Sequence, residues 1–169
     1  MRILFVCTGN MCRSPMAEGL ARAVIDREYP ETRERFDFSS AGVAALEGNV
    51  PAREAVEVMM ERGIDISGHR ARNVTRRILE ASDLVLTMEG AQRKRVEEMT
   101  GGVAPPVFLL LELGEAGTEE RDGLWARDAS RYEVLDPIGM SADEYRYVAA
   151  IMEGPIENIL RLLGSGLET

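Results

Sequence analysis

The sequence contains little cysteine: only two of its 169 residues are cysteines, Cys7 and Cys12. Two cysteines cannot build the disulfide framework of a small secreted domain, and by themselves they cannot supply the four ligands of a structural metal site. No run approaches the roughly 20 apolar residues that cross a bilayer, and the apolar start MRILFVC is shorter than a signal peptide. We therefore expect a cytoplasmic protein without a metal, a cofactor or a membrane anchor.

Basic residues are also in deficit, with 20 Lys and Arg against 29 Asp and Glu and a formal net charge of −9. This charge argues against a general nucleic-acid or anionic-membrane binder, because the long-range field repels phosphate-rich partners. Any phosphate site must therefore be local. The length and the 45% hydrophobic content suit one globular core, so we expect a single domain over residues 1–169, either a monomer or a weak dimer.

Apolar segments alternate along the chain with segments of helical spacing. The sequence predicts strands at 2–6, 35–42, 82–88 and 105–113, of which the first is apolar throughout, as in a parallel strand covered on both faces. This alternation predicts a doubly wound α/β domain with about four parallel strands and helices on both faces.

Local signals mark the expected helix ends. Ser14 before Pro15 predicts an N-cap, Pro51 opens a helix that ends near Arg62, and another helix covers 91–99. Ser141 and Glu144 form a capping-box pattern ahead of a long terminal helix, which we expect Gly154-Pro155 to kink or split. The charged segment 114–133 is expected to be a surface loop with one short helix at most.

The stretch CTGNMCRS follows the first predicted strand, where open α/β sheets commonly bind ligands. A loop that curls its amides inward and ends on a helix N-terminus binds anions, and Gly9 and Asn10 tolerate the positive φ that such a loop needs. Arg13 offers a planar fork for two phosphate oxygens, and these groups together would stabilise a Cys7 thiolate. Alone, such a cysteine is more often core filler and such an arginine a surface charge, but their joint pattern favours a nucleophile in a phosphate-binding loop.

The run VCTGNMCRSPMAEG resembles the signature of the low-molecular-weight protein tyrosine phosphatases, and SSAG, GIDISGHRAR, SDLVLTM and the DP at 136–137 extend the resemblance along the chain. The resemblance implies that Cys7 attacks phosphorus to give a phosphocysteine and that Arg13 binds the equatorial oxygens. It further implies that Ser14 hydrogen-bonds the thiolate. The implied phosphate-binding loop consists of Thr8, Gly9, Asn10, Met11 and Cys12.

The family's general acid is an aspartate before a proline, which here is Asp136. Asp-Pro is also a common turn initiator, and Asp122 and Asp128 are rivals by position, although neither precedes a proline. We favour Asp136 on the resemblance.

The resemblance assigns supporting roles to four further residues. His69, the single histidine, would support Asn10 through hydrogen bonds, together with Ser40. Cys12 matches the family's second loop cysteine, which can form a reversible disulfide with the nucleophile; a small buried residue is an equally good interpretation.

Two features of the sequence point to different phosphorylated residues as the substrate. The wall positions after SAG and after DP carry no aromatic residue here, and this feature resembles the subgroup that acts on phosphoarginine in proteins. That subgroup has threonine where this chain has Met11, and a bulky apolar residue there resembles the tyrosine-directed enzymes. We favour a phosphotyrosine phosphatase, with protein-arginine phosphatase as the alternative and Met11 as the selectivity position. Arsenate reduction is disfavoured because no cysteine follows Cys12, and a non-catalytic anion-binding regulator is disfavoured by the joint presence of Cys7, Arg13 and Asp136.

Overall fold

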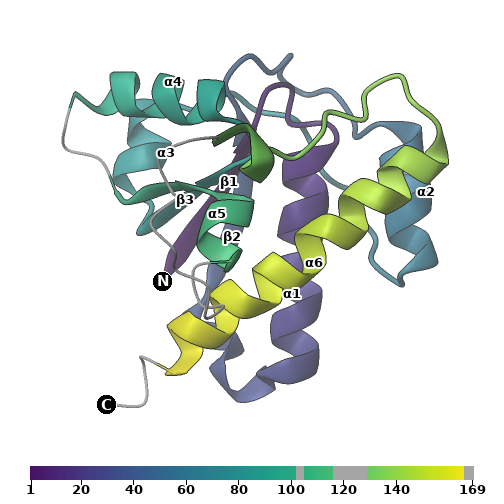
Figure 1. Ribbon diagram of the computed structural model, residues 1–169, viewed down its shortest axis with the longest axis horizontal. Coiled ribbons are helices and arrows are strands. Elements are labelled where there is room, and N and C mark those ends of the chain that lie inside the picture. Colours follow the sequence, from purple (N-terminus) through teal and green to yellow (C-terminus); the bar gives the residue numbers. More distant parts are fainter. Residues whose placement is uncertain (102–104, 116–128, 166–169) are drawn as a thin grey trace.

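The computed structural model describes residues 1–101, 105–115 and 129–165. Its centre is a sheet in the order β2-β1-β3-β4, in which every neighbouring pair is parallel (Figure 1). In the central strand, Ile3 lies opposite Phe38 of one neighbour and Leu84 of the other. The strands are β1 (Arg2–Cys7), β2 (Asp37–Gly42), β3 (Leu84–Thr87) and β4 (Val107–Leu109).

Helices cover both faces of this sheet, as the sequence predicts. Ile3 and Phe5 of β1 belong to a core cluster with side chains of α1, α2, α5 and α6, whereas Leu4 and Val6 pack with side chains of α3 and α4. This alternation follows from the two-residue period of a strand. The helices are α1 (Arg13–Glu28), α2 (Arg53–Glu61), α3 (Arg76–Glu80), α4 (Gly90–Thr100), α5 (Leu110–Glu115) and α6 (Ala142–Ser165), with 3-10 turns η1 (Pro30–Arg35) and η2 (Ala129–Tyr132).

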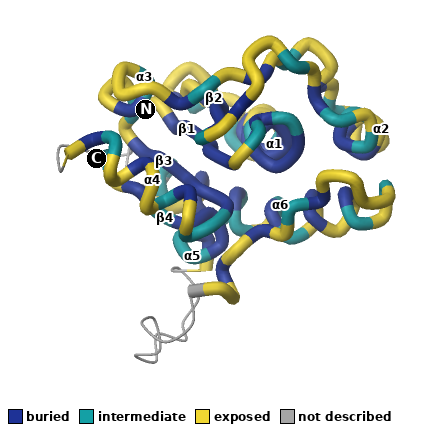
Figure 2. Tube along the Cα trace, turned by 90° about the horizontal axis from the view of Figure 1, so that it is seen from above, coloured by how far each residue is buried: buried dark blue, intermediate teal, exposed yellow. Residues whose placement is uncertain are grey.

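Helix α1 begins earlier than predicted. Cys12 is its N-cap and Arg13 its first residue, so Ser14 lies inside the first turn and is not the cap. Pro15 still fits, because the first helical turn does not need its missing N–H. The helix packs against β1, β2 and α6, and ten of its 16 residues are buried; Figure 2 shows it end-on, largely in dark blue.

The structure differs from the sequence predictions at two further places in the second half. Only Val107–Leu109 of the predicted strand 105–113 is extended, and Leu110–Glu115 is helical. Helix α6 is continuous through Pro155 and is therefore not split. The two departures are linked, because a Cβ on Gly114 of α5 would lie 2.4 Å from Pro155 Cα: the two helices pack with almost no space at this point. No helix among the described residues is long and apolar enough to cross a membrane.

Most of the predicted surface loop 114–133 lies outside the described residues, and so do both rival acids, Asp122 and Asp128. Its described ends differ from the prediction, since α5 extends to Glu115 and η2 precedes Glu133. The predicted strand 35–42 begins at Asp37, and the predicted helix 51–62 covers Arg53–Glu61.

Candidate active site

The loop 8–12 connects β1 to α1 at the carboxyl edge of the sheet. It is held against the end of β2, where the Val43 and Ala44 amides donate to the Cys7 and Thr8 carbonyls at 2.9 and 3.0 Å. A Cβ on Gly42 would lie 2.4 Å from the Thr8 oxygen, so this close approach requires glycine. The amides of Gly9, Met11 and Cys12 have no acceptor among the described residues and are free to bind an anion.

Asn10 is the centre of the loop's hydrogen bonds. It is fully buried and adopts φ 54°, a left-handed conformation that asparagine tolerates better than most residues. Its side-chain nitrogen donates to Ser14 Oγ at 2.8 Å and to Ser40 Oγ at 3.1 Å, and its side-chain oxygen accepts from the Arg72 amide at 2.9 Å. Gly9 does not share this conformation: it is absent from the positive-φ positions, and a Cβ there would meet no protein atom within 4 Å.

His69 and Ser40, the two residues expected to support the loop, both contact Asn10. The Nε2 of His69 lies 3.0 Å from the Asn10 carbonyl, to which only a ring N–H can donate. The Ser40 hydroxyl accepts a hydrogen bond from Asn10 and donates one to Glu18 Oε2 at 2.8 Å. The loop conformation is therefore fixed by a continuous network that reaches α1 and the segment before α3.

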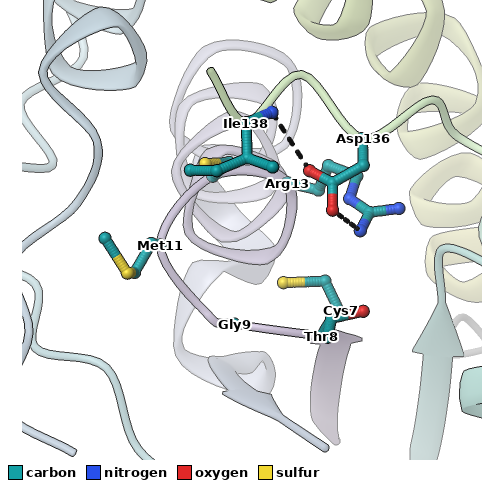
Figure 3. Close-up of a pocket in the computed structure, with 8 residues that line it drawn as sticks. Cys7, Thr8, Gly9, Met11, Arg13, Asp136 and Ile138 are labelled. Atoms are coloured by element: carbon teal, nitrogen blue, oxygen red, sulfur yellow. Dashed lines mark hydrogen bonds and ion pairs between the residues drawn. The ribbon is translucent and has the colours of Figure 1, made fainter. Parts of the chain in front are cut away.

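Cys7 ends β1 and is 2% exposed, with its sulfur facing the loop (Figure 3). The Asn10 amide donates to Cys7 Sγ at 3.2 Å, and Ser14 Oγ lies 3.0 Å from the same sulfur. Ser14 Oγ accepts from Asn10, and its single proton can be donated either to Cys7 Sγ or to the more distant Ala41 carbonyl at 3.5 Å. The Cys7 sulfur therefore lies within hydrogen-bond reach of two groups of the loop and of α1.

Arg13 is 1% exposed and lies between two carboxylates. Its Nη1 donates to Glu89 Oε1 and, at 2.9 Å, to the Val134 carbonyl, while Nη2 donates to Asp136 Oδ2 at 2.7 Å. Among the buried side-chain polar atoms of the described chain, Arg13 Nε alone has no hydrogen-bond partner. A buried N–H without an acceptor is costly, so this atom points to an oxygen ligand that the site is built to receive.

The segment before Asp136 is fixed to the same edge. The Val134 amide donates to the Met88 carbonyl at 2.8 Å, and the Glu133 carboxylate accepts from the Gly90 amide at 2.9 Å. The other oxygen of Asp136 accepts from the Ile138 amide at 3.2 Å, so the carboxylate stands above Cys7, as Figure 3 shows. The segment thereby brings Asp136 to Cys7 and Arg13, although it lies more than 120 residues after both of them in sequence.

These groups surround a pocket of about 190 Å³. Met11 and Ile138 form apolar parts of its wall, and Met11 is held in place by the Ala52 amide, which donates to its carbonyl at 2.9 Å. The described residues include no group of three or more His, Cys, Asp or Glu side chains that could hold a metal ion. The lining comprises Cys7, Thr8, Gly9, Met11, Cys12, Arg13, Asp136 and Ile138.

Sequence reasoning missed Glu89, which forms the second ion pair of Arg13. The signal was present, because Glu89 directly follows the strand 82–88 and the carboxyl ends of parallel strands meet at one edge. It also missed Gln92, whose amide nitrogen donates to Thr8 Oγ1 at 3.1 Å and whose oxygen accepts from the Met88 amide at 3.0 Å. The start of α4 thus supports both ends of the loop.

The family model described as low molecular weight phosphotyrosine protein phosphatase matches residues 2–167. The chain belongs to this family. A probable low molecular weight protein-tyrosine-phosphatase EpsP from Ralstonia nicotianae is 40% identical over 66% of this chain and 71% of its own. A protein-arginine-phosphatase from Bacillus subtilis is 33% identical over 99% of this chain and 97% of its own.

Solved structures of the phosphatase family share the fold. A YwlE arginine phosphatase mutant, with a phosphorylated serine in place of its active-site cysteine, has a TM-score of 0.79 at 30% identity and covers 99% of this chain and 98% of its own. The chain is therefore a hydrolase of the low molecular weight phosphatase family, with relatives named for two different phosphorylated residues.

Proposed function

We propose that the protein hydrolyses phosphotyrosine in proteins through a phosphocysteine intermediate formed on Cys7. The observation that carries the proposal is the unpaired Arg13 Nε, buried beside a sulfur that already accepts hydrogen bonds. A phosphoryl group in the pocket would give Nε and the free loop amides their acceptors. These donors would stabilise the charge of the transferring group, which is most of what phosphoryl transfer requires.

In this proposal, Cys7 forms the S–P bond while the bond to the leaving oxygen breaks, and Asp136 protonates that oxygen. Ser14 then stabilises the departing thiolate when water attacks the phosphocysteine and Asp136 accepts the water's proton. The ion pair between Arg13 and Asp136 must open, because the phosphate oxygens need the same Nη2. The phosphorylated serine of the YwlE mutant supports the position of the nucleophile.

Asp136→Asn is expected to slow an aryl phosphate with a poor leaving group by about a hundredfold or more, because that leaving group needs a proton. Hydrolysis of an ester with a good leaving group, such as p-nitrophenyl phosphate, should fall much less. The measurement is kcat/KM across a series of aryl phosphates. Asp143→Asn, at a side chain 87% exposed, is the matched control and should leave the series unchanged. Equal slowing of all esters would rule out proton transfer by Asp136.

The choice of phosphotyrosine is supported by the apolar wall of Met11 and Ile138, against which a phenyl ring can pack. Phosphoarginine is the second candidate. The relative that covers 99% of this chain is named a protein-arginine-phosphatase, and the Asp136 carboxylate could accept from a guanidinium.

Met11→Thr is expected to shift the ratio of kcat/KM values for phosphotyrosine and phosphoarginine peptides toward phosphoarginine by about tenfold. It removes apolar wall and adds a hydroxyl, and such changes to a pocket alter specificity by this order. The wild type should prefer the phosphotyrosine peptide. Met140→Thr is the control, since Met140 is exposed and does not line the pocket. A wild-type preference for phosphoarginine would favour the second candidate, and an unchanged ratio would remove Met11 as the selectivity position.

A further inference from the structure

Two buried groups beside the pocket have no part in the phosphoryl transfer proposed above. Cys12 caps α1 and lines the pocket together with Cys7, and both cysteines are free thiols. Tyr145, on the first turns of α6, is fully buried, and its hydroxyl lies 3.3 Å from Cys12 Sγ. A core tyrosine normally finds a partner for its hydroxyl, but here the partner is a sulfur of the phosphate-binding loop.

The direction of this hydrogen bond depends on the state of Cys12. Between a neutral thiol and a neutral phenol either group can donate, but to a Cys12 thiolate only Tyr145 can donate. Burial raises the pKa of Cys12 to about 11, and the charges of Asp136 and Cys7 act in the same direction. The Tyr145 hydroxyl and, to a smaller extent, Arg13 favour the Cys12 thiolate and so lower that pKa. Burial raises the pKa of Tyr145 itself, so the phenol keeps the proton it donates.

We propose that Tyr145 is a positioning residue for the oxidised state of the site, where its hydroxyl hydrogen-bonds the Cys12 thiolate that closes a disulfide with Cys7. The proposal rests on the proposed function in one respect, namely that Cys7 is the reactive thiolate. The oxidant is hydrogen peroxide: the Cys7 thiolate takes one peroxide oxygen to become a sulfenic acid, and hydroxide leaves.

In the second step the Cys12 thiolate attacks the sulfur of this sulfenic acid. The S–S bond forms and the S–O bond breaks, and the departing hydroxide combines with the proton that Cys12 released, so the net product is water. Tyr145 keeps its own proton and only stabilises the attacking sulfur. If this step is slow, a second peroxide converts the sulfenic acid to a sulfinic acid, which thiols do not reduce. Tyr145 therefore biases oxidation of the enzyme toward the reversible product.

The test compares wild type with Tyr145→Phe, which keeps the buried ring and removes only the hydroxyl. Each protein is treated with hydrogen peroxide, quenched over a time course, and analysed by mass spectrometry for the Cys7–Cys12 disulfide and for sulfinic acid at Cys7. Phosphatase activity is measured before oxidation and after reduction with dithiothreitol. Tyr147→Phe is the matched control, because Tyr147 lies two residues away on the same helix and is 59% exposed.

Tyr145→Phe should form the disulfide about tenfold more slowly, because a hydrogen bond to a charged group is lost. It should accumulate more sulfinic acid and regain less activity than either wild type or Tyr147→Phe. In a Cys12→Ser background, Tyr145→Phe should have no further effect on recovery, since the tyrosine acts through Cys12.

Equal disulfide rates in wild type and Tyr145→Phe would overturn the proposal. So would an effect of Tyr145→Phe that persists in the Cys12→Ser background, because it would indicate a general loosening of the fold. The mass measurement needs no substrate, so a wild type that forms the disulfide but does not hydrolyse phosphotyrosine would refute the proposed function alone. A wild type that hydrolyses phosphotyrosine but forms no disulfide would refute this inference alone.

Discussion

Cys7→Ser is expected to lower kcat/KM for p-nitrophenyl phosphate by at least about a thousandfold, because a serine hydroxyl is a far weaker nucleophile than a thiolate. The surroundings of Cys7 increase the difference. The Asn10 amide and the Ser14 hydroxyl both contact its sulfur, at 3.2 and 3.0 Å, in positions from which they can donate to an attacking thiolate. The assay is run at mildly acidic pH without added metal.

The control for Cys7→Ser is anion binding by the same variant. Arg13 and the loop amides remain in place, so inorganic phosphate should still raise the melting temperature of the variant about as much as that of the wild type. Loss of this shift would indicate a collapsed loop and make the activity uninterpretable; Cys7→Ala would then replace the serine variant. Hydrolysis at the wild-type rate by a variant that still binds phosphate would exclude Cys7 as the nucleophile.

The position of the loop 8–12 between a strand and a helix could be predicted from the sequence because its determinants are local. A strand, a short loop with Asn10, and a helix that begins at Arg13 follow one another within a few residues, and Cys7 and Arg13 are fixed at the two ends of that loop. The doubly wound fold class was predictable for the same reason, since each strand and most helices carry their own apolar pattern and alternate along the chain.

Local patterns did not identify the partners of Arg13, although the place of Glu89 directly after a predicted strand puts it at the same edge of the sheet. Glu89 and the Val134 carbonyl reach it from α4 and from the segment after η2, and only the arrangement of the strands brings them to one edge. The same limit applies to Tyr145, whose position in the apolar stripe of α6 predicts a core residue, whereas its contact with Cys12 depends on how α6 crosses α1.

The run PPVFLLLEL shows why the sequence did not predict the boundary between β4 and α5. Its apolar residues suit a strand or a buried helix equally well, and the spacing of apolar residues alone cannot distinguish the two. The structure contains both a strand and a helix in this run. Val107 and Leu109 of β4 are buried in the sheet, and Leu110 and Leu111 of α5 are buried against α6. The close approach of Gly114 in α5 to Pro155 in α6 is a contact between residues distant in sequence, which the local pattern does not contain.

Arg13→Lys is expected to lower kcat/KM for a phosphotyrosine peptide by about a hundredfold or more. The variant keeps the positive charge but loses the planar fork, and with it the Nε donor that has no partner in the protein. Lysine has one nitrogen to divide among Glu89, Asp136 and the phosphate, whereas arginine has three. The loss is therefore expected even though the variant retains the positive charge.

Arg13 also stabilises the fold, so the measurement must separate binding from folding. Arg13→Lys should remain folded, because a cation still faces the two carboxylates; Arg13→Ala would leave those carboxylates close together without a counter-charge and should unfold at a lower temperature. Inorganic phosphate should raise the melting temperature of Arg13→Lys much less than that of the wild type. Arg76→Lys, in an exposed pair with Glu80 on α3, is the matched control and should change neither activity nor the phosphate shift. If Arg13→Lys keeps the full phosphate shift and more than about a third of the wild-type kcat/KM, the guanidinium fork does not bind the transferring phosphoryl group, since loss of even one such donor costs more than that.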